Sequence, residues 1–290
     1  MIDDKKRSEY AAAKRRTALG NFIFDVIIYA VLLFVVVATV YPFWNTIAIS
    51  LNDGLDSLKG GIKLWPRKFT WKNYQDLFVT PRIFQAGFIS VTRTILQTIL
   101  SVFCTTMLAY ALSRKEFVLR KWLTTILVIS MYVNAGLIPG YMLIKKLHLL
   151  GKYSVYIIPC LVDIFNFILV RTYINGLPDS FVESARIDGS PEFLTYNAIV
   201  LPIMKPAIAT QAIFTFVTSW NDLFRPSVIL TKQNKFTLPI MVSLLNGDIY
   251  KREHGAIYVG LTLTALPLII VYFILSKYIV AGVALGSVKG

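Results

Sequence analysis

The chain has 290 residues, of which 56% are hydrophobic and only 16% are charged. This balance lies far to the apolar side of soluble domains, so the composition predicts an integral membrane protein. The net charge of +14 does not indicate nucleic-acid binding, because the lysines and arginines lie singly or in short clusters between apolar runs and form no basic stripe along one element.

A polar leader, residues 1–20, precedes the first long apolar run. Positive charges concentrated before a first membrane helix favour a cytoplasmic N-terminus. Six of them lie here: Lys5, Lys6, Arg7, Lys14, Arg15 and Arg16. The apolar run that follows begins late and is too long for the core of a cleaved signal peptide, so we expect it to remain in the protein as a helix.

Six apolar segments come close to the roughly 20 residues that a helix needs to cross about 30 Å of hydrocarbon. We therefore expect an all-α integral membrane protein with six transmembrane helices, an arrangement that returns the C-terminus to the cytoplasm. In chain order the segments are Asn21–Phe43, Gln85–Leu112, Trp122–Ile144, Ser154–Ile174, Pro206–Ile229 and Ala256–Ser276.

These segments divide the chain into regions after the leader. The regions are the first membrane helix (residues 21–43), an outer loop (residues 44–84), the main membrane domain (residues 85–280) and a cytoplasmic tail (residues 281–290). Loop charges support this orientation only in part. The basic cluster at residues 114–121 lies on the expected inner side, whereas the lysines at residues 145–152 lie on the expected outer side.

The cysteines and histidines indicate neither a metal site nor catalysis. Cys104 and Cys160 both lie inside apolar segments without metal-ligand spacing, where cysteine behaves as a small packing residue. His148 and His254 lie in expected outer loops and have no metal spacing and no nucleophile–base pairing. An intramembrane enzyme is therefore a disfavoured alternative.

A polar stretch, ESARIDGSPEFLTYNAIVLP (Glu183–Pro202), separates the fourth and fifth apolar segments. Ser180 and Glu183 have the spacing of a capping box, which predicts a helix that begins at Phe181. Asp188 and Gly189 are expected to end this helix, because glycine adopts the left-handed conformation without a Cβ clash.

The same stretch predicts a second short helix. Ser190 suits the N-cap and Pro191 the first helical position. Leu201-Pro202 and Lys205-Pro206 are expected to break the chain again before the fifth span. The product is an elbow of two short helices, residues 180–202, that is too polar to cross a membrane. It is either a well-capped surface loop or a rigid knob that docks in a groove of a soluble partner.

The spacing resembles the EAA motif of ATP-binding-cassette (ABC) importer permeases: Glu-Ala-Ala, three residues, Gly, nine residues, Ile, one residue, Leu-Pro. The matching residues are Glu183, Ala185, Gly189, Ile199, Leu201 and Pro202, and Asp188 also lies in the motif. Ser184 stands where the pattern has its second alanine, a change of one small residue for another.

Further phrases resemble the carbohydrate-type branch of this family, which includes the shorter maltose permease subunit. They are GLPDSFVESARIDG (Gly176–Gly189), LPIMKPAIAT (Leu201–Thr210), SWNDLFRPSVIL (Ser219–Leu230), FTLPIMV (Phe236–Val242) and the final GSVKG (Gly286–Gly290). The resemblance runs from about residue 85 to the C-terminus. It departs at residues 281–284, which lack the usual arginine and threonine.

The resemblance implies a type I ABC importer permease fold, in which residues 85–280 form the permease domain and residues 180–202 a cytoplasmic coupling elbow. It implies four kinds of partner: a second homologous permease subunit, an ATPase dimer, an external solute-binding protein and a sugar or oligosaccharide substrate. Membrane lipid surrounds the chain. The expected location is the bacterial cytoplasmic membrane, with several crossings and both termini in the cytoplasm.

The same resemblance implies residue roles. Glu183 would pair with a basic residue of the ATPase, Ala185 would allow close approach to it, and Gly189 would form the turn. The tail would reach between the ATPase subunits through Ser287, Val288, Lys289 and Gly290.

A nucleotide site of its own is not expected in this chain. A phosphate-binding loop requires Gly, four residues, then Gly-Lys-Ser/Thr. At the nearest candidate, Gly151-Lys152, Lys146 replaces the first glycine and Tyr153 replaces the hydroxyl residue. The chain is therefore expected to be a transport subunit rather than an enzyme, and to bind no cofactor or metal. ATP and magnesium would be bound by the partner ATPase.

Polar side chains inside the apolar segments are candidates for a substrate pathway, because they are costly in a bilayer unless they face a cavity or a partner. They are Asn134, Asp163, Asn166, Trp220, Asn221 and Asp222. Aromatic rings beside amides suit sugars, whose C–H faces stack on rings while their hydroxyls form hydrogen bonds. Alternatively, these residues join helices, or Trp220 anchors at the membrane interface. Asp25 and Arg93 are expected to extend from span ends to the interface.

Two other functions remain open. The chain could be an importer permease for a non-sugar solute, or an ion-coupled secondary transporter, although the inverted repeats of the latter are not visible in the sequence. The stretch Gly136–Pro159 resembles a subgroup associated with complex oligosaccharides, including uronate-containing ones. The basic outer loops would suit an acidic sugar or an acidic binding protein.

Overall fold

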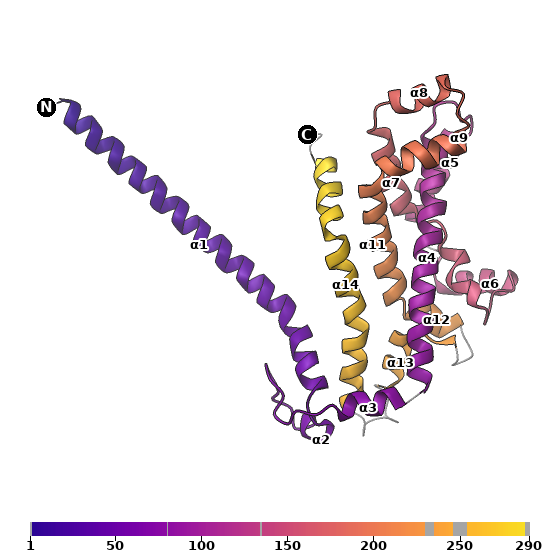
Figure 1. The fold of residues 1–290 in the computed structure, drawn as a ribbon, viewed down its shortest axis with the longest axis horizontal. Coiled ribbons are helices and arrows are strands. Elements are labelled where there is room, and N and C mark those ends of the chain that lie inside the picture. Colours follow the sequence, from indigo (N-terminus) through magenta and orange to yellow (C-terminus); the bar gives the residue numbers. More distant parts are fainter. Residues whose placement is uncertain (1, 80, 134, 230–234, 246–253, 288–290) are drawn as a thin grey trace.

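The computed structural model describes residues 2–79, 81–133, 135–229, 235–245 and 254–287, and for residues 2–20, 224–226, 254 and 277–287 it describes the backbone alone. Across these ranges the regular structure is helical, apart from one isolated antiparallel bridge between Asn52 and Phe69. Three long helices lie side by side in a bundle (Figure 1): α4 (Pro81–Ser113), α11 (Lys205–Asn221) and α14 (His254–Ser287).

Shorter helices cover the two ends of this bundle. At one end lie α8 (Ser180–Ile187) and α9 (Glu192–Thr195), and at the other lie α2 (Gly54–Ser57) and α3 (Lys72–Val79) (Figure 1). The remaining α-helices are α1 (Ile2–Ser50), α5 (Arg120–Tyr132), α6 (Leu137–Lys146), α7 (Ile164–Asn175), α10 (Leu201–Ile203), α12 (Phe224–Ile229) and α13 (Leu238–Leu245). Tyr153–Tyr156 and Ile158–Cys160 form 3-10 helices, and Tyr196–Val200 forms a π-helix.

Membrane-length helices account for part of the six-span prediction. The described residues contain three that are long and apolar enough to cross: Asn21–Ser50, Pro81–Ser113 and Gly255–Ser276. The first, second and sixth predicted spans are thus confirmed as continuous helices. The first helix continues past the predicted end at Phe43, because Pro42 lies inside it without ending it. Two bent helix pairs raise the number of candidate spans in the described residues to five at most.

The third predicted span, Trp122–Ile144, is wrong as a single helix. The chain forms α5, leaves the helical conformation at Val133, and begins α6 after Gly136. Gly136 has a φ of 82°, a left-handed conformation that glycine adopts without strain and that a continuous helix cannot contain. Hydrophobic content predicted the length of this segment but not its interruption.

The fourth and fifth predicted spans are also broken. In the fourth, Ser154–Ile174, the two 3-10 turns precede α7 at a bend of 43°. The fifth, Pro206–Ile229, divides into α11 and α12, because Asp222 is extended, with φ −68° and ψ 95°. At each break, some backbone N–H and C=O groups lose their helical hydrogen bonds. In a membrane these groups need hydrogen bonds to other protein groups or to water.

Two apolar clusters hold the ends of the bundle together. Beneath α8, Leu112 of α4 and Phe167 of α7 pack with Val182 of α8 and with Tyr196 of the π-helix. At the opposite end, Leu77 and Val259 belong to a cluster that joins α3, α4, α13 and α14. Between the clusters, α4 presents a buried polar stripe at helical spacing: Ser90, Arg93, Thr94, Gln97, Ser101 and Thr105.

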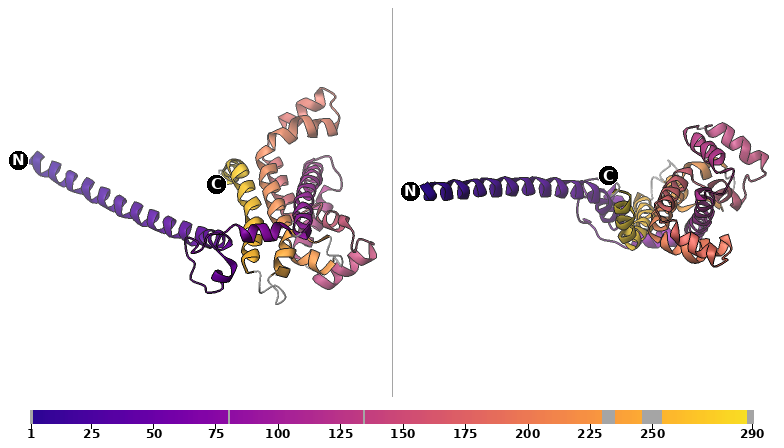
Figure 2. Two further views of the ribbon diagram at one scale, coloured as in Figure 1. Left: turned by 60° about the horizontal axis from the view of Figure 1, so that its bottom comes forward. Right: turned by 90° about the horizontal axis from the view of Figure 1, so that it is seen from above.

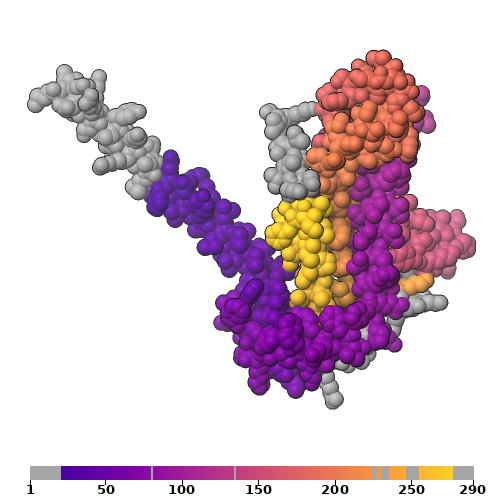
Figure 3. Space-filling view, viewed as in Figure 1, coloured from indigo at the N-terminus to yellow at the C-terminus, as the bar shows by residue number. Residues whose placement is uncertain are grey.

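Helix α1 stands apart from the bundle for most of its length (Figures 1, 2 and 3). Its apolar side chains from Phe22 to Phe43 are exposed, and it approaches α14 only near its C-terminal end. Such a surface is stable only when lipid or another apolar protein surface covers it.

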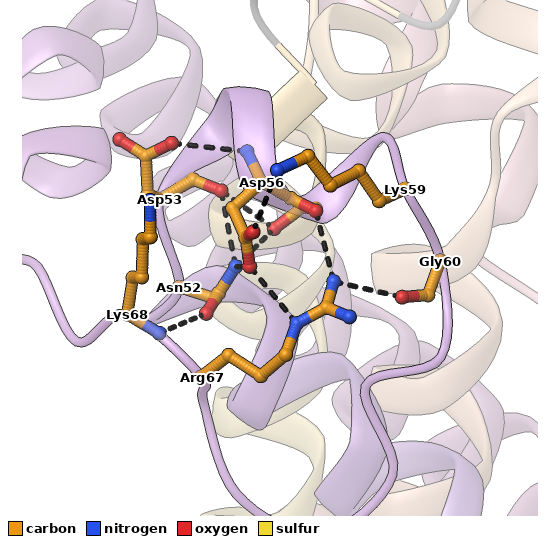
Figure 4. Close-up of polar contacts among 8 residues, drawn as sticks. Asn52, Asp53, Asp56, Lys59, Gly60, Arg67 and Lys68 are labelled. Carbon is orange, nitrogen blue, oxygen red and sulfur yellow. Dashed lines mark hydrogen bonds and ion pairs between the residues drawn. The ribbon is translucent and has the colours of Figure 1, made fainter.

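A polar network gives the loop after α1 a defined shape (Figure 4). At its centre the buried Asn52 donates to the Asp56 carboxylate (3.2 Å) and accepts from the backbone N–H of Lys68 (2.7 Å). Arg67 donates to the same carboxylate (3.0 Å) and to the Gly60 carbonyl (2.8 Å). The hydrogen bonds from Asn52 and Arg67 lower the pKa of Asp56.

Candidate functional site

The predicted elbow is present as two short helices with a sharp turn between them, but its first helix starts differently. Helix α8 begins at Ser180 rather than Phe181, and its start carries no side-chain cap. The predicted capping box is therefore wrong. The Asp179 carboxylate lies at the N-cap but accepts from Lys115 Nζ (2.7 Å) in the α4–α5 loop, so a tertiary contact replaces the local one.

The left-handed turn predicted at Gly189 is confirmed. Gly189 has a φ of 74°. Its N–H donates to the Arg186 carbonyl and the N–H of Ser190 donates to the Ala185 carbonyl, both at 2.9 Å. This is the Schellman pattern, which satisfies the last carbonyls of the helix and requires a residue that tolerates positive φ. The turn conformation thus follows directly from the sequence.

The second helix of the elbow differs from the prediction at both ends. Pro191 occupies the N-cap instead of Ser190, and α9 begins at Glu192. The helical structure continues through Leu201-Pro202. The preceding π-helix has i to i−5 hydrogen bonds, so the i to i−4 hydrogen bond that a proline cannot donate is already absent there. The break predicted at Lys205-Pro206 is confirmed, because the chain turns by 83° at the buried Met204, directly before α11.

Helix α8 has two faces of different character. Val182 and Ala185 are buried against the rest of the chain, at 7% and 4% exposure. The opposite face carries Glu183, Ser184 and Ile187, the last 86% exposed. Ala185 therefore packs closely within this chain, and its implied approach to the ATPase stays a prediction. Glu183 is exposed and available to a partner.

A charged cluster fastens the elbow to α4. Arg186 contacts Glu116 Oε1 (2.5 Å) in the α4–α5 loop and Glu192 Oε1 (2.7 Å) at the start of α9. The Tyr110 hydroxyl of α4 donates to the other oxygen of Glu192 (2.7 Å). We call these four residues the Arg186 bracket. The bracket joins α8 and α9 to the end of α4. Of its other three members, only Glu192 lies close to Arg186 in sequence.

A hollow lies between the elbow and α4. Its volume is about 400 Å³, with an apolar lining and the charged residues of the bracket at its margin. The lining consists of Met107, Tyr110, Ala111, Arg114, Glu116, Phe117, Arg186, Glu192, Phe193 and Tyr196. The hollow lies beside the apolar cluster in which Leu112 of α4 packs with Val182 and Tyr196 of the elbow.

The bracket should resist acidification. The hydrogen bond from Arg186 lowers the pKa of Glu116 from 4.5 to about 2. Because the folded-state pKa is depressed, the contribution of this contact is complete above the unfolded value and is lost as the pH falls toward 2. We expect backbone hydrogen exchange of α8, corrected for the intrinsic rate, to stay constant from pH 7 to pH 5.

A Glu116→Gln variant is the control for this prediction, since it carries no titrating group at this position. It should exchange faster than the parent at neutral pH and by the same amount at pH 5. A large acceleration of α8 exchange in the parent between pH 7 and pH 5 would contradict the assignment.

The described members of the predicted pathway set make separate contacts, and their role in a substrate pathway stays a prediction. Asp163 accepts from the Asn166 backbone N–H (2.8 Å) and caps α7. The Asn166 side chain lies 3.4 Å from Thr215 of α11, and Trp220 donates to the Thr264 carbonyl of α14 (2.8 Å). Asn221 is exposed, and Asn134 lies outside the described residues. For Asn166 and Trp220 the structure therefore agrees with the alternative, a helix-joining role.

Arg93 does not extend to the membrane interface, so that prediction is wrong. Its side chain is 1% exposed and contacts Asp222 Oδ2 at 2.7 Å. The sequence did contain a signal: Arg93 belongs to the polar stripe of α4 at intervals of three and four residues, which marks a buried helix face. Its partner could not be deduced, since the two residues are 129 positions apart.

The tail lies mostly beyond the described structure. Helix α14 continues to Ser287, well past the predicted span end at Ser276, and Val288, Lys289 and Gly290 are outside the described residues.

Residues 97–285 match the family of binding-protein-dependent transport system inner membrane components. The fold is similar to that of a solved bacterial ABC transporter involved in the import of the acidic polysaccharide alginate. The TM-score is 0.78 and the identity 24%, over 89% of this chain and 96% of that one. The family match defines the class of protein, an inner membrane component of a transport system. The chain belongs to the family of binding-protein-dependent transport system inner membrane components, the permease subunits of ABC importers.

Curated relatives match over nearly the whole length. The polygalacturonan/rhamnogalacturonan transport system permease protein YtcP of Bacillus subtilis is 31% identical over 94% of this chain and 100% of its own. The protein LplC of the same organism is 32% identical over 87% of this chain and 90% of its own. The arabinooligosaccharides transport system permease protein AraQ of Halalkalibacterium halodurans is 30% identical over 89% of this chain and 94% of its own.

Proposed function

We propose that this chain forms half of the transmembrane pathway of an oligosaccharide importer and receives its driving force through the elbow, residues 180–202. The observation that carries the proposal is the two-faced helix α8. One face is packed on the membrane domain, while Glu183, Ser184 and Ile187 on the other are exposed, and Glu183 matches the glutamate of the EAA motif.

The exposed face suits docking in a groove. The Ile187 side chain is 86% exposed, so it can pack into a groove of a partner protein. The Glu183 carboxylate, one helical turn earlier, can pair with a basic residue of that partner. Nucleotide binding to the ATPase can shift the permease only if it favours one of the permease's conformational states. The elbow therefore has to transmit the change in the ATPase to the membrane domain. The chain passes from the elbow into α11 through the 83° bend at Met204, so a displacement of the elbow reaches α11 directly.

Orientation follows from the same proposal. The start of α1, the end of α14 and the elbow all lie toward one end of the molecule (Figure 1). The basic leader favours the cytoplasm, so we place this end, with the ATPase, inside the cell. Six crossings result when α5 and α6 count as one broken span beside the three long helices and the two bent pairs.

A second permease subunit would cover α1. The helix exposes apolar side chains on all sides from residue 21 to residue 43 and touches its own bundle only near its C-terminal end. Half of a two-subunit pathway explains this arrangement, because a helix that leans away from its own bundle can lie against a homologous partner as well as in lipid.

The substrate class rests on relatives and on charge. Relatives are named for the transport of polygalacturonan and rhamnogalacturonan and of arabinooligosaccharides. A second solved neighbour, with a TM-score of 0.56, was determined with an alginate pentasaccharide-bound periplasmic protein. The outer loop of this chain exposes Lys63, Lys68 and Lys72, which would suit an acidic sugar or an acidic binding protein. A non-sugar solute is the alternative.

Transport into proteoliposomes tests the proposal. The complete transporter is reconstituted with its ATPase side inward, and labelled oligosaccharides of galacturonate and of arabinose are supplied outside with the cognate binding protein. Uptake should require ATP in the lumen and survive collapse of ion gradients by ionophores. A complex with a catalytically inactive ATPase is the matched control. Uptake driven by an ion gradient without ATP would contradict the proposal, and uptake of a labelled peptide in place of the sugars would favour the non-sugar alternative.

A further inference from the structure

One buried charge in the membrane domain has no role in the elbow or in helix capping. Arg93 lies within α4, a candidate membrane span, with 1% of its side chain exposed. A charged group inside a bilayer is costly, so it is paired and its presence indicates a functional site. Its guanidinium donates from Nη2 to the Asp222 carboxylate (2.7 Å) and from Nη1 to the Asp222 carbonyl (3.4 Å).

An aromatic ring completes the site. The Tyr156 ring centroid lies 4.2 Å from Arg93 Cζ, within the range of a cation–π contact. Tyr156 is itself 3% exposed, and its hydroxyl donates to the Lys235 carbonyl (2.8 Å). The guanidinium is therefore held on two sides, by a carboxylate and by a ring.

The two partners of Arg93 lie at interruptions of helices. Asp222 forms the extended break between α11 and α12, and Tyr156 belongs to the 3-10 turn before the 43° bend that leads to α7. Arg93 lies in an unbroken helix. One side chain of a continuous helix thus fastens two discontinuities, and such breaks are the places where a packed helical domain can change its arrangement.

Helix α11 connects this site to the elbow. It begins directly after the 83° bend at Met204 and ends at Asn221, next to Asp222. With 17 residues it is about 25 Å long and acts as a rod. The N-terminal end of α11 follows the elbow. The Arg93–Asp222 ion pair holds its C-terminal end to α4. Displacement of the elbow is therefore resisted at the far end by Arg93.

We infer that the Arg93–Asp222 ion pair, with Tyr156 on the guanidinium, is a latch that holds the far end of α11 to α4 and must separate when the pathway changes state. Arg93 and Asp222 are positioning residues in this role. The inference rests on the proposed coupling through the elbow. The ion pair stabilises the arrangement that this structure shows, so its removal favours the other arrangement.

The test uses the complete transporter with its ATPase and binding protein in proteoliposomes. Asp222→Asn removes the attraction. Because it leaves Arg93 buried without its counter-charge and could impair folding, the double variant Arg93→Gln/Asp222→Asn removes both charges together. The reversed pair, Arg93→Asp/Asp222→Arg, restores an attraction. Lys59→Gln is the control, because it removes an ion pair to Asp56 whose lysine is 69% exposed.

The charge-neutral double variant should assemble in normal amount and hydrolyse ATP in the absence of binding protein at least about fivefold faster than the parent, within the range of ordinary coupling energies. Its stimulation by solute-loaded binding protein should fall correspondingly. The reversed pair should recover part of the stimulation, and Lys59→Gln should equal the parent. A purely structural pair would lower the amount of complex without raising the unstimulated rate.

Two results would overturn the latch. One is a charge-neutral variant that assembles and keeps the parent's unstimulated rate and stimulation. The other is a loss of assembly in every Arg93 and Asp222 variant, with unchanged unstimulated ATP hydrolysis per assembled complex. Failure of the proposed function is distinguishable, because it would appear in the parent as uptake that does not depend on ATP.

Discussion

Replacing Gly189 with valine should leave the protein in the membrane but uncouple ATP hydrolysis from uptake. Gly189 has a φ of 74°, where a residue with a Cβ is strained by about 1–2 kcal/mol and a β-branched residue by more. An added Cβ would meet nothing within 4 Å, so the effect comes from the backbone and not from a clash. Relief of the strain opens the turn and moves α8 relative to α9. The measurement is the ratio of solute taken up to ATP hydrolysed in proteoliposomes.

Two variants control for this effect. Gly189→Asn should retain much of the coupling, because asparagine tolerates the left-handed conformation. Gly140→Val should resemble the parent, since Gly140 also has open space around its Cβ but lies in α6 without a positive φ. Normal coupling by Gly189→Val at normal expression would show that the turn does not transmit motion.

Replacing Arg186 with alanine should also uncouple the transporter, by a different route. The variant loses the contacts to Glu116 and Glu192, so α8 is no longer fastened to the α4–α5 loop or to α9, and the hydrogen bond from Tyr110 to Glu192 is the part of the bracket that remains. The exposed face of α8 is unchanged, so the ATPase should still bind. We expect uptake per ATP to fall about fivefold, while co-purification of the ATPase stays near the parental level.

Stability should change little in the same variant. The carboxylates of the bracket are more than half exposed, and exposed ion pairs contribute about 0–1 kcal/mol each. Arg186→Lys should give an intermediate result, because an ammonium group keeps the charge but cannot hold two carboxylates in the planar fork of a guanidinium. Loss of ATPase binding in Arg186→Ala would instead assign Arg186 to the docking surface itself.

Local signals in the sequence predicted the elbow well where the backbone alone decides. The turn at Gly189 follows from the freedom of glycine, and the polar composition of residues 180–202 excludes a membrane span. The helix starts were less predictable. Ser180 and Glu183 have ideal spacing for a capping box, yet Asp179 and Lys115 form an ion pair across two segments and no side-chain cap forms.

The broken spans illustrate a second limit. Apolar length predicted segments of membrane size at Trp122–Ile144 and Pro206–Ile229, and both contain interruptions. The apolar character of a whole segment does not reveal one residue that leaves the helix, such as Gly136 or Asp222. The cost of such a break depends on what surrounds it, and that is a property of the packed domain.

By itself, then, the sequence determined the membrane class, three continuous long helices, the motif of the permease family and the position of the turn at Gly189. Each of these depends on composition or on residues within a few positions of one another. The tertiary structure alone decided that Ala185 faces inward, that Arg186 holds the elbow to α4, and that Arg93 is buried against Asp222. These outcomes depend on partners up to 129 positions away, and the choice among such partners is made only when the helices pack.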